Sequence, residues 1–223
     1  FSREVLAKTH TTTASQKSHL TKASNKQVSS KQEYSRNSAK SSSLPDLRKY
    51  PSGTPRKKAF LRTVMPYITS QNAAITAERN WLISKQYQGQ WSPAERARLK
   101  DIAKRYKVKW SGNTRKIPWN TLLERVDIIP TSMVATMAAA ESGWGTSKLA
   151  RNNNNLFGMK CMKGRCTNAP GKVKGYSQFS SVKESVSAYV TNLNTHPAYS
   201  SFRKSRAQLR KADQEVTATA MIH

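Results

Sequence analysis

The sequence predicts a mainly helical (α+β) domain with a small β-hairpin lobe, preceded by a disordered basic tail. Residues 8–43 are largely Ser, Thr, Lys, Gln and Asn, so they cannot bury enough apolar surface to offset the entropy of ordering. Downstream, apolar residues recur at helical spacing, and Phe157 to Phe179 changes to short strand-like runs around glycine- and proline-containing turns. We therefore divide the chain into a tail, 1–43, and a domain, 44–223.

Helix signals subdivide the domain. Ala59 to Tyr87 carries an apolar stripe interrupted by Pro66, which predicts one kinked helix or two successive helices. The tetrapeptide Ser92–Glu95 combines an N-cap, a proline at the first helical position and a capping-box glutamate, so it opens the next helix. Trp119 to Ile129 predicts a further short helix, which Pro130 separates from the helix that follows.

Three acidic residues have structural explanations. Glu124 and Asp127 can pair with neighbouring arginines, as charges on helical faces commonly do. Ser181 and Glu184 have the spacing of a second capping box, so Glu184 is explained by the start of a helix.

The net charge points to an anionic partner. The chain carries a formal net charge of +27 and has a pI near 10.5, and nucleic acid, a membrane surface or a cell wall with anionic polymers would suit it. The basic residues are scattered rather than interleaved with aromatics in a dense block, so we expect no dedicated nucleic-acid site. Anionic envelope surfaces fit better, and no apolar run of about 20 residues predicts a transmembrane span.

The first residues bear on location. Val5 and Ala7 have the spacing of a signal-peptidase site, and the apolar core of such a signal would lie before Phe1. We therefore expect an exported protein of the periplasm or cell envelope. The alternative is an arbitrary boundary inside a cytosolic tail.

A helix of small residues carries the strongest catalytic signal, Glu141. Val134, Met137 and Ala138 share its face at helical spacing, so we expect Glu141 to point toward apolar side chains and to be buried. Gly143 predicts the helix end and places Glu141 in the last turn. Burial and a helix C-terminus both disfavour a charged carboxylate, and a general acid must hold a proton. The alternative is a glutamate that only caps or pairs near the helix end.

The residues around Glu141 also carry a family resemblance. The run RVDIIPTSMVATMAAAESGWGTSKLARNNNNLFGMK, above all Glu141 to Gly158, resembles the family 73 glycoside hydrolases, bacterial peptidoglycan N-acetylglucosaminidases of lysozyme-like fold. The resemblance extends from about Trp119 to the C-terminus. It implies a lysozyme-like helical domain that acts on peptidoglycan glycan strands, cleaving the β-1,4 bond between N-acetylglucosamine and N-acetylmuramic acid. We expect no cofactor.

The resemblance assigns roles to particular residues. The glutamate of the family's ESGWG element is its general acid and corresponds to Glu141, and the NNLFG element, here Asn154 to Gly158, lines the groove. Aromatic faces and amides suit sugar rings. The substrate-binding candidates are therefore Trp144, Asn155, Phe157 and Tyr176.

Two departures from the family pattern affect the mechanism. Many members place a second carboxylate in the β-lobe, whereas this chain has no Asp or Glu between Glu141 and Glu184. A protein nucleophile needs two carboxyl groups about 5 Å apart, so we expect the substrate's own 2-acetamido carbonyl to act instead, with water delivered by a more distant group as the competing route. A tyrosine-bearing C-terminal element of the family is also missing, so we expect a C-terminally truncated domain.

Two other functions fit the same residues. A lytic transglycosylase also works with one glutamate but leaves a 1,6-anhydro product. A non-catalytic, cationic wall-binding module would keep the charge without turnover.

The chain has two cysteines, Cys161 and Cys166, on either side of a turn containing Lys163-Gly164. Facing positions of a hairpin bring sulfurs close enough to bond, so in an oxidising compartment we expect a disulfide. A metal would need further ligands, and the histidines lie in the tail, beside Pro197 or at the chain end: His10, His19, His196 and His223. We expect no metal site.

Overall fold

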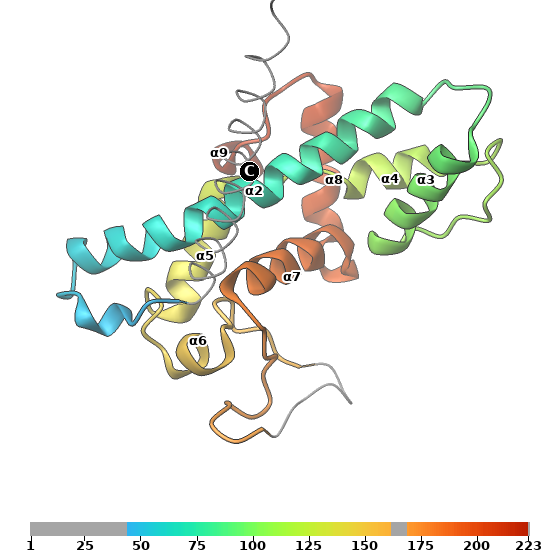
Figure 1. The fold of residues 1–223 in the computed structure, drawn as a ribbon. Helices are drawn as coiled ribbons and strands as arrows, with labels where there is room; N and C mark the ends of the chain where they lie inside the picture. Colours follow the sequence, from blue (N-terminus) through green and yellow to red (C-terminus); the bar gives the residue numbers. More distant parts are fainter. Residues whose placement is uncertain (1–43, 162–168, 223) are drawn as a thin grey trace, which may run out of the picture. The chain divides into compact units, whose positions relative to one another are not determined.

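The computed structural model describes residues 44–161 and 169–222, and this part of the chain is mostly helical (Figure 1). The predicted tail, 1–43, lies outside the described residues. In chain order the elements are η1 (Leu47–Lys49), α2 (Thr54–Lys85), α3 (Pro93–Arg105), α4 (Trp119–Arg125), α5 (Thr131–Ser142), α6 (Lys148–Asn153), α7 (Val182–Thr195), η2 (Pro197–Tyr199), α8 (Ser200–Lys211) and α9 (Ala218–Met221). The mainly helical fold predicted from the sequence is confirmed.

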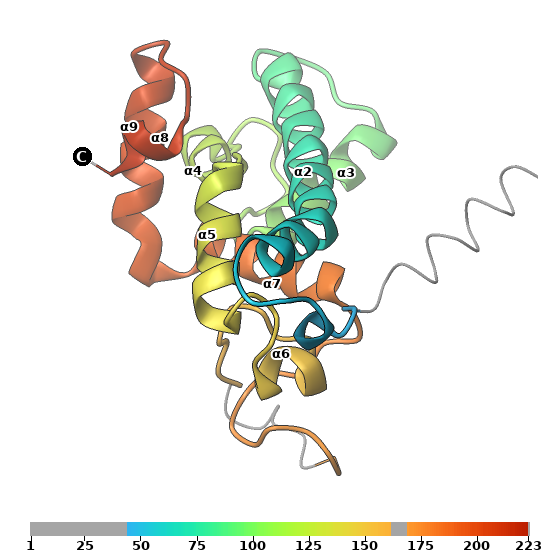
Figure 2. The ribbon, with the colours of Figure 1, turned by 90° about the vertical axis from the view of Figure 1, so that its left-hand side faces the viewer.

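Helix α2 provides the long surface against which α5 and α7 pack (Figure 2). Pro66 lies inside α2, and of the two expected forms the structure has the single continuous helix. Val64 and Ile68, on either side of Pro66, are fully buried, so packing holds the helix across the missing hydrogen bond. The buried residues of α2 recur at helical spacing: Ala59, Phe60, Val64, Ile68, Ile75 and Leu82.

Helix α3 begins where the tetrapeptide Ser92–Glu95 predicts. The Ser92 hydroxyl accepts a hydrogen bond from the Glu95 N–H, and the Glu95 carboxylate accepts one from the Ser92 N–H, both at 3.1 Å. This completes the capping box. Lys85, the last residue of α2, pairs with Glu95 at 2.5 Å, which ties the two helices together.

Helix α4 ends at Arg125, earlier than predicted, because side chains hold the following linker, 126–130, by its main-chain carbonyls. From α2, Arg79 donates to the carbonyl of residue 126 at 3.0 Å and Asn72 to that of residue 129 at 2.7 Å. From α8, Arg206 donates to the carbonyl of residue 128 at 2.9 Å. The linker's carbonyls are satisfied by these side chains, so the helix need not continue.

The Asp127 carboxylate lies at the centre of this linker and is 1% exposed. Arg210, Arg79 and Arg206 approach it at 2.7, 3.5 and 3.9 Å. Burial alone would raise the pKa of Asp127, but the Arg210 hydrogen bond and the three positive charges outweigh it and lower this pKa. Burial lowers the pKa of Arg206 to about 10, so Arg206 stays charged at neutral pH. Asp127 pairs with arginine as predicted, but its partners come from α2 and α8 and not from the neighbouring arginines that the sequence suggests.

The segment predicted as a β-hairpin lobe is held mainly by turns. Lys160 and Tyr176 form an antiparallel bridge. Beside it, the Cys161 N–H donates to the Gly175 carbonyl at 3.3 Å. Residues 162–168 lie outside the described part of the chain. In the part that the structure describes, the expected strands are therefore reduced to this short pairing.

Helices α7 and α8 follow the lobe in the sequence. The Ser181 hydroxyl accepts a hydrogen bond from the Glu184 N–H at 3.1 Å, which confirms the predicted start of α7. The Glu184 carboxylate accepts from the Ser180 N–H at 2.7 Å, one residue before the position that a capping box would use. Arg203 of α8 donates to the His196 carbonyl, just after α7, at 2.8 Å.

We expect Asp127→Asn to lower the free energy of unfolding by about 3–5 kcal/mol, because it leaves the buried charge of Arg206 uncompensated. The folded-state pKa of Asp127 lies below the unfolded value of about 3.9. Its stabilisation is therefore complete above about pH 4 and is lost as the pH falls through the folded pKa. Urea unfolding at pH 7 and pH 3 should show a difference between parent and variant that shrinks at the lower pH.

The matched control is Asp101→Asn, because Asp101 pairs with Arg105 at 2.8 Å on the solvent side of α3 and is 63% exposed. An exposed pair contributes less than about 1 kcal/mol. Equal losses for the two variants would contradict a special role for Asp127.

Candidate active site

Glu141 lies next to the end of α5, as predicted, but its side chain is exposed. Val134 and Ala138 are buried as expected, whereas Met137, one turn before Glu141, is 39% exposed. The expected burial of Glu141 is therefore wrong. Packing against α2 selects a neighbouring face of α5 for burial, and spacing within the helix could not distinguish the two faces. The buried residues of α5 are Val134, Ala135, Ala138, Ala139 and Ser142.

Three consecutive left-handed residues turn the chain after α5. Gly143, Trp144 and Gly145 have φ of 55°, 55° and 77°, and Gly143 is the C-cap that the sequence predicts. The buried Ser142 hydroxyl accepts from the Gly145 N–H at 2.9 Å. A Cβ at Gly145 would overlap the Leu47 side chain, so the turn packs directly on η1. The main chain beneath Glu141 is thereby fixed.

Asparagines at the end of α6 hold a second loop, 173–179, through its main chain. Asn153 donates to the Val173 carbonyl at 3.1 Å, and its side-chain oxygen accepts from the Val173 N–H at 2.8 Å. Asn154 has a φ of 51° and donates to the Phe179 carbonyl at 3.0 Å. These contacts replace the strand-to-strand hydrogen bonds that the sequence predicts for the lobe.

Asn155, a predicted substrate-binding residue, is fully buried. Its amide donates to the carbonyls of Met159 and Ser177 at 2.9 and 3.0 Å. Its oxygen accepts from the N–H groups of Phe157 and Met159 at 3.3 and 3.1 Å. The side chain uses its polar atoms inside the turn, so its geometry is that of a residue that shapes residues 155–159.

Gly158, within this turn, faces the Glu141 carboxylate. Its φ is 64°, and a methyl group added there would lie 3.0 Å from Glu141 Oε2. The main chain of the turn thus approaches the carboxylate as closely as a glycine allows. The end of α5 and the asparagine-held turn form the two sides of the candidate site.

An aromatic pair lies next to these two sides. Phe157 is 6% exposed, and its ring stacks on Tyr189 of α7 with centroids 4.2 Å apart and planes 3° apart. Burial raises the pKa of Tyr189 to about 12, with smaller contributions from Tyr199 and from the negative charge of Glu141. Tyr189 therefore keeps its proton at neutral pH and is a hydrogen-bond donor near Glu141.

Tyr189 had no functional assignment from the sequence. It falls within the apolar stripe of α7, beside Val186 and Val190, and such stripes usually form core. The signal that could have identified it is the hydroxyl, which a buried tyrosine normally directs toward a polar partner. Gly158 was indicated only through the family resemblance.

Trp144, another predicted substrate-binding residue, lies on a different side of α5 from Glu141. Its ring meets Phe60 edge to face at 5.6 Å, and Lys57 Nζ lies 5.1 Å from its centroid. It lines an apolar groove of about 520 Å³ together with Leu61, Met65, Ser132, Ala135, Thr136, Ala139 and Ala140. At 3.6 residues per turn, Glu141 projects from roughly the opposite side of the helix from these α5 residues. The structure does not bring Trp144 and Glu141 together.

The remaining predicted residues lie in the lobe. Tyr176 is half-buried and pairs with Lys160 in the bridge. Cys161 is disulfide-bonded, while Cys166 lies outside the described residues, so the Cys161–Cys166 pairing stays a prediction.

Metal ligands do not gather in the described part of the chain, where no group of three or more His, Cys, Asp or Glu side chains could hold an ion. His196 Nδ1 accepts a hydrogen bond from the Ala198 N–H at 3.0 Å, which explains this residue as the cap of η2.

The described domain is mainly helical, and its exposed glutamate at a helix end faces a glycine turn beside an aromatic pair. Residues 118–221 match the family model Glucosaminidase, described as mannosyl-glycoprotein endo-beta-N-acetylglucosaminidase. No solved structure matches the chain significantly. Residues 118–221 are therefore similar to a glucosaminidase domain, and this match indicates a glycoside hydrolase acting on peptidoglycan.

None of the helices in the described ranges is long and apolar enough to cross a membrane.

We expect Gly158→Ala to lower the rate of peptidoglycan cleavage by about tenfold or more if Glu141 is the acid that the sequence predicts, because the new methyl group displaces its carboxylate and small misplacements of a catalytic group are costly. Gly171→Ala is the matched control. Gly171 also has a positive φ, of 80°, but a methyl group there meets nothing within 4 Å. Similar rates and similar thermal unfolding for both variants would show that only backbone strain matters.

The disulfide predicted between the two cysteines can be tested by counting free thiols. If Cys161 and Cys166 form the disulfide, thiol titration of unfolded, unreduced protein should find no free thiol. Treatment with a reductant should then release two thiols per chain, and two free thiols before reduction would refute the bond.

Proposed function

We propose that this hydrolase is an endo-β-N-acetylglucosaminidase in which Glu141 is the general acid for the β-1,4 bond between N-acetylglucosamine and N-acetylmuramic acid. One observation above all supports this role: the exposed Glu141 carboxylate faces Gly158 across the site. A solvent-accessible carboxyl on a fixed helix end can reach a glycosidic oxygen, as proton donation requires.

Substrate assistance fits the long stretch without acids that follows Glu141 in the sequence. The sequence has no Asp or Glu from residue 142 to residue 183. Glu184, the next acid along the chain, accepts hydrogen bonds from Ser180 at the start of α7. A carboxylate nucleophile would need to lie about 5 Å from the acid. The 2-acetamido group of the substrate supplies the nucleophile without one.

The substrate-assisted hydrolysis proceeds in two steps. Glu141 gives its proton to the glycosidic oxygen while the bond from that oxygen to C1 breaks. The acetamido carbonyl oxygen attacks C1 and forms a cyclic oxazolinium ion. Water next attacks C1, the Glu141 carboxylate takes one of its protons, and the ring reopens to N-acetylglucosamine. The same residue thus serves first as acid and then as base.

Three aromatic residues are the sugar-binding candidates nearest to this chemistry. Phe157 and Tyr189 form the stacked pair, and the neutral Tyr189 hydroxyl can donate to a sugar or acetamido oxygen. Tyr176 is half-buried in the lobe and offers part of its ring to a glycan. Action in the cell envelope suits the net charge of +27, because peptidoglycan and its neighbours are anionic.

We expect Glu141→Gln to reduce cleavage of purified sacculi by about 10²-fold or more without changing thermal unfolding, because glutamine cannot donate the proton. Glu184→Gln is the matched control: it removes a carboxylate whose contacts are at the start of α7, and it should keep most of the parent rate. A Glu141→Gln enzyme within tenfold of the parent would exclude Glu141 as the acid.

Mass spectrometry of the products separates the proposed reaction from its alternatives. Reducing N-acetylglucosamine ends are expected. Products with 1,6-anhydro ends would indicate a lytic transglycosylase, and intact sacculi would indicate a binding module. Either result would refute the proposed hydrolysis.

A further inference from the structure

The family match begins at residue 118, so it leaves α3 and the loop that follows it without a function. This region contains a cavity of about 400 Å³ between the exposed side of α3 and the loop. Its lining residues are Trp91, Pro93, Arg96, Ala97, Lys100, Trp110 and Gly112.

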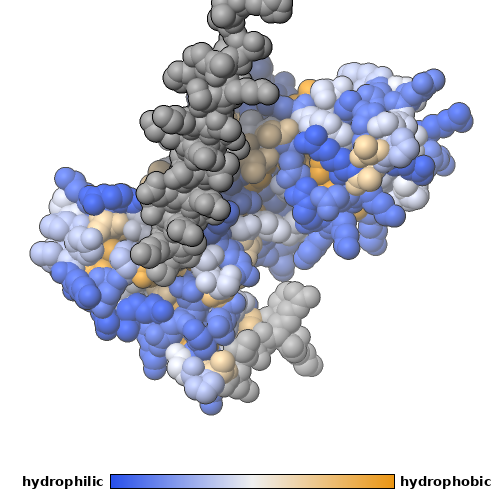
Figure 3. All heavy atoms as spheres, in the orientation of Figure 1, coloured by the Kyte–Doolittle hydropathy of each residue, from blue (hydrophilic) through white to orange (hydrophobic). Residues whose placement is uncertain are grey.

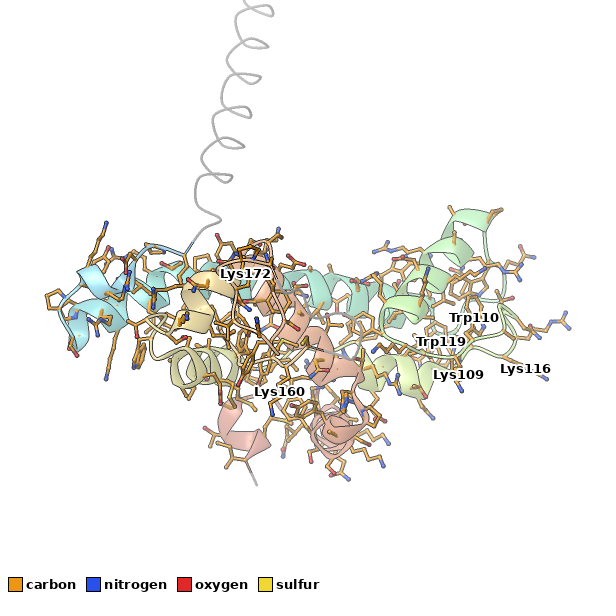
Figure 4. The ribbon with its side chains drawn as sticks, turned by 90° about the horizontal axis from the view of Figure 1, so that it is seen from below. Lys109, Trp110, Lys116, Trp119, Lys160 and Lys172 are labelled. Carbon is orange, nitrogen blue, oxygen red and sulfur yellow. The ribbon has the colours of Figure 1, made fainter. Side chains whose placement is uncertain are left out.

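Tryptophan side chains build one side of the cavity. Trp91 packs between Trp81 and Trp119, with ring centroids 6.3 Å away in each case. Trp110 is half-buried, and its Nε1–H donates to the Asn113 carbonyl at 3.0 Å, which sets the orientation of the ring. Figure 4 shows Trp110 and Trp119 in the same region, around α3 and α4. The cavity therefore has aromatic walls that are held before any ligand arrives.

Trp91 also carries an unmet hydrogen-bond donor. Its Nε1–H is buried and has no hydrogen-bond partner within the described ranges. Such a donor costs free energy, and buried polar groups usually have a partner. Because Nε1 is shielded from solvent, Trp91 contributes its ring and not this donor to the cavity.

Positively charged side chains line the other side of the cavity. Arg96 is exposed and donates through Nη2 to the Gly112 carbonyl at 2.6 Å, which closes the loop over α3. Lys100, one turn further along, is exposed at the rim. The residues that line the cavity, all within the described chain, include no acid. The nearby acids on α3 already have partners, since Glu95 pairs with Lys85 at 2.5 Å and Asp101 with an arginine at 2.8 Å.

The surface around the cavity is also positively charged. Residues 93–118 contain nine lysines and arginines against two acidic residues. Lys109 and Lys116 are labelled beside Trp110 in Figure 4. On the face drawn in Figure 3, the described surface is mostly hydrophilic with small hydrophobic patches. The field at the cavity is positive, so it selects an anionic ligand.

We propose that this cavity is an accessory binding site for peptidoglycan, in which a sugar ring lies against Trp110 and stem-peptide carboxylates lie at Lys100 and Arg96. The proposal rests on the peptidoglycan substrate of the proposed function. An apolar aromatic wall with a few polar groups is the usual composition of a small-ligand site. Nucleic acid would need rows of stacking rings along a basic groove, whereas this cavity holds two tryptophans at one point. The site would hold a glycan strand outside the residues that match the family model, while Glu141 acts elsewhere on the same polymer.

The test uses the full chain with Glu141→Gln, so that the probe is not cut. The probe is a disaccharide tetrapeptide from peptidoglycan, and calorimetric titration measures its affinity. When Trp110→Ala is introduced into the Glu141→Gln protein, binding should weaken by about tenfold, as expected for loss of an aromatic anchor. When Lys100→Gln is introduced instead, the affinity for the probe should fall by about threefold, as expected for loss of an exposed charge contact. Di-N-acetylchitobiose, a disaccharide with no carboxylate, should show no effect of Lys100→Gln, because it has no negative charge for Lys100 to contact.

Matched controls separate the cavity from general charge and from misfolding. Lys104→Gln removes a charge from the same helix outside the lining, and Tyr87→Ala removes a side chain that is 93% exposed. Neither should change affinity. Trp110→Phe keeps an aromatic face and should restore most of the binding, with unfolding temperatures compared for every variant. Equal losses for Lys100→Gln and Lys104→Gln, or losses for a single-stranded oligonucleotide but not for the muropeptide, would overturn the proposal.

The two proposals fail separately. Absence of product from the enzyme with Glu141 intact would refute the hydrolysis, while the titrations would still decide whether the cavity binds. Unchanged affinity in Trp110→Ala would refute the accessory site and leave the hydrolysis standing.

Discussion

The buried carboxylate of Asp127 organises the helices that support the site. Arginines from α2 and α8 reach it from two directions, and they also take up carbonyls of the linker before α5. The start of α5 is thereby fixed, and a rigid helix of 12 residues carries that position to Glu141 near its other end. The placement of Glu141 thus depends on the ion cluster of Asp127 and its arginines, at the other end of the same helix. Loss of a charge partner there leaves a buried arginine unpaired.

The two sides of the site are built by different kinds of interaction. Glu141 stands on a helix held by apolar packing against α2 and by a glycine turn packed on η1. Gly158 stands in a turn held by hydrogen bonds from buried asparagine side chains, chiefly Asn155. Packing resists bending along the whole helix, whereas a few hydrogen bonds fix a short turn locally. Packing in the core therefore fixes the position of the Glu141 carboxylate, whereas hydrogen bonds within the lobe fix the position of Gly158.

Local signals in the sequence predicted local features well. The Ser92 capping box and the Gly143 helix end depend on a few adjacent residues, and both are present as predicted. Features set by distant partners were not predictable: the exposed face of Glu141 depends on where α2 packs, and the burial of Arg206 depends on Asp127 far away in the chain. The sequence indicated Glu141 through its motif, but Tyr189 became a candidate only when α7 was placed beside the turn.

The asparagine contacts have a consequence for how such a lobe can diversify. Asn153, Asn154 and Asn155 bind loop 173–179 through backbone N–H and C=O groups, which every non-proline residue provides. The loop's own side chains take no part in these bonds. Mutations in the loop can therefore change the side chains that it exposes while its backbone course is kept. Under the proposed function, selection can therefore change glycan recognition by this loop separately from the geometry that places Gly158 against Glu141.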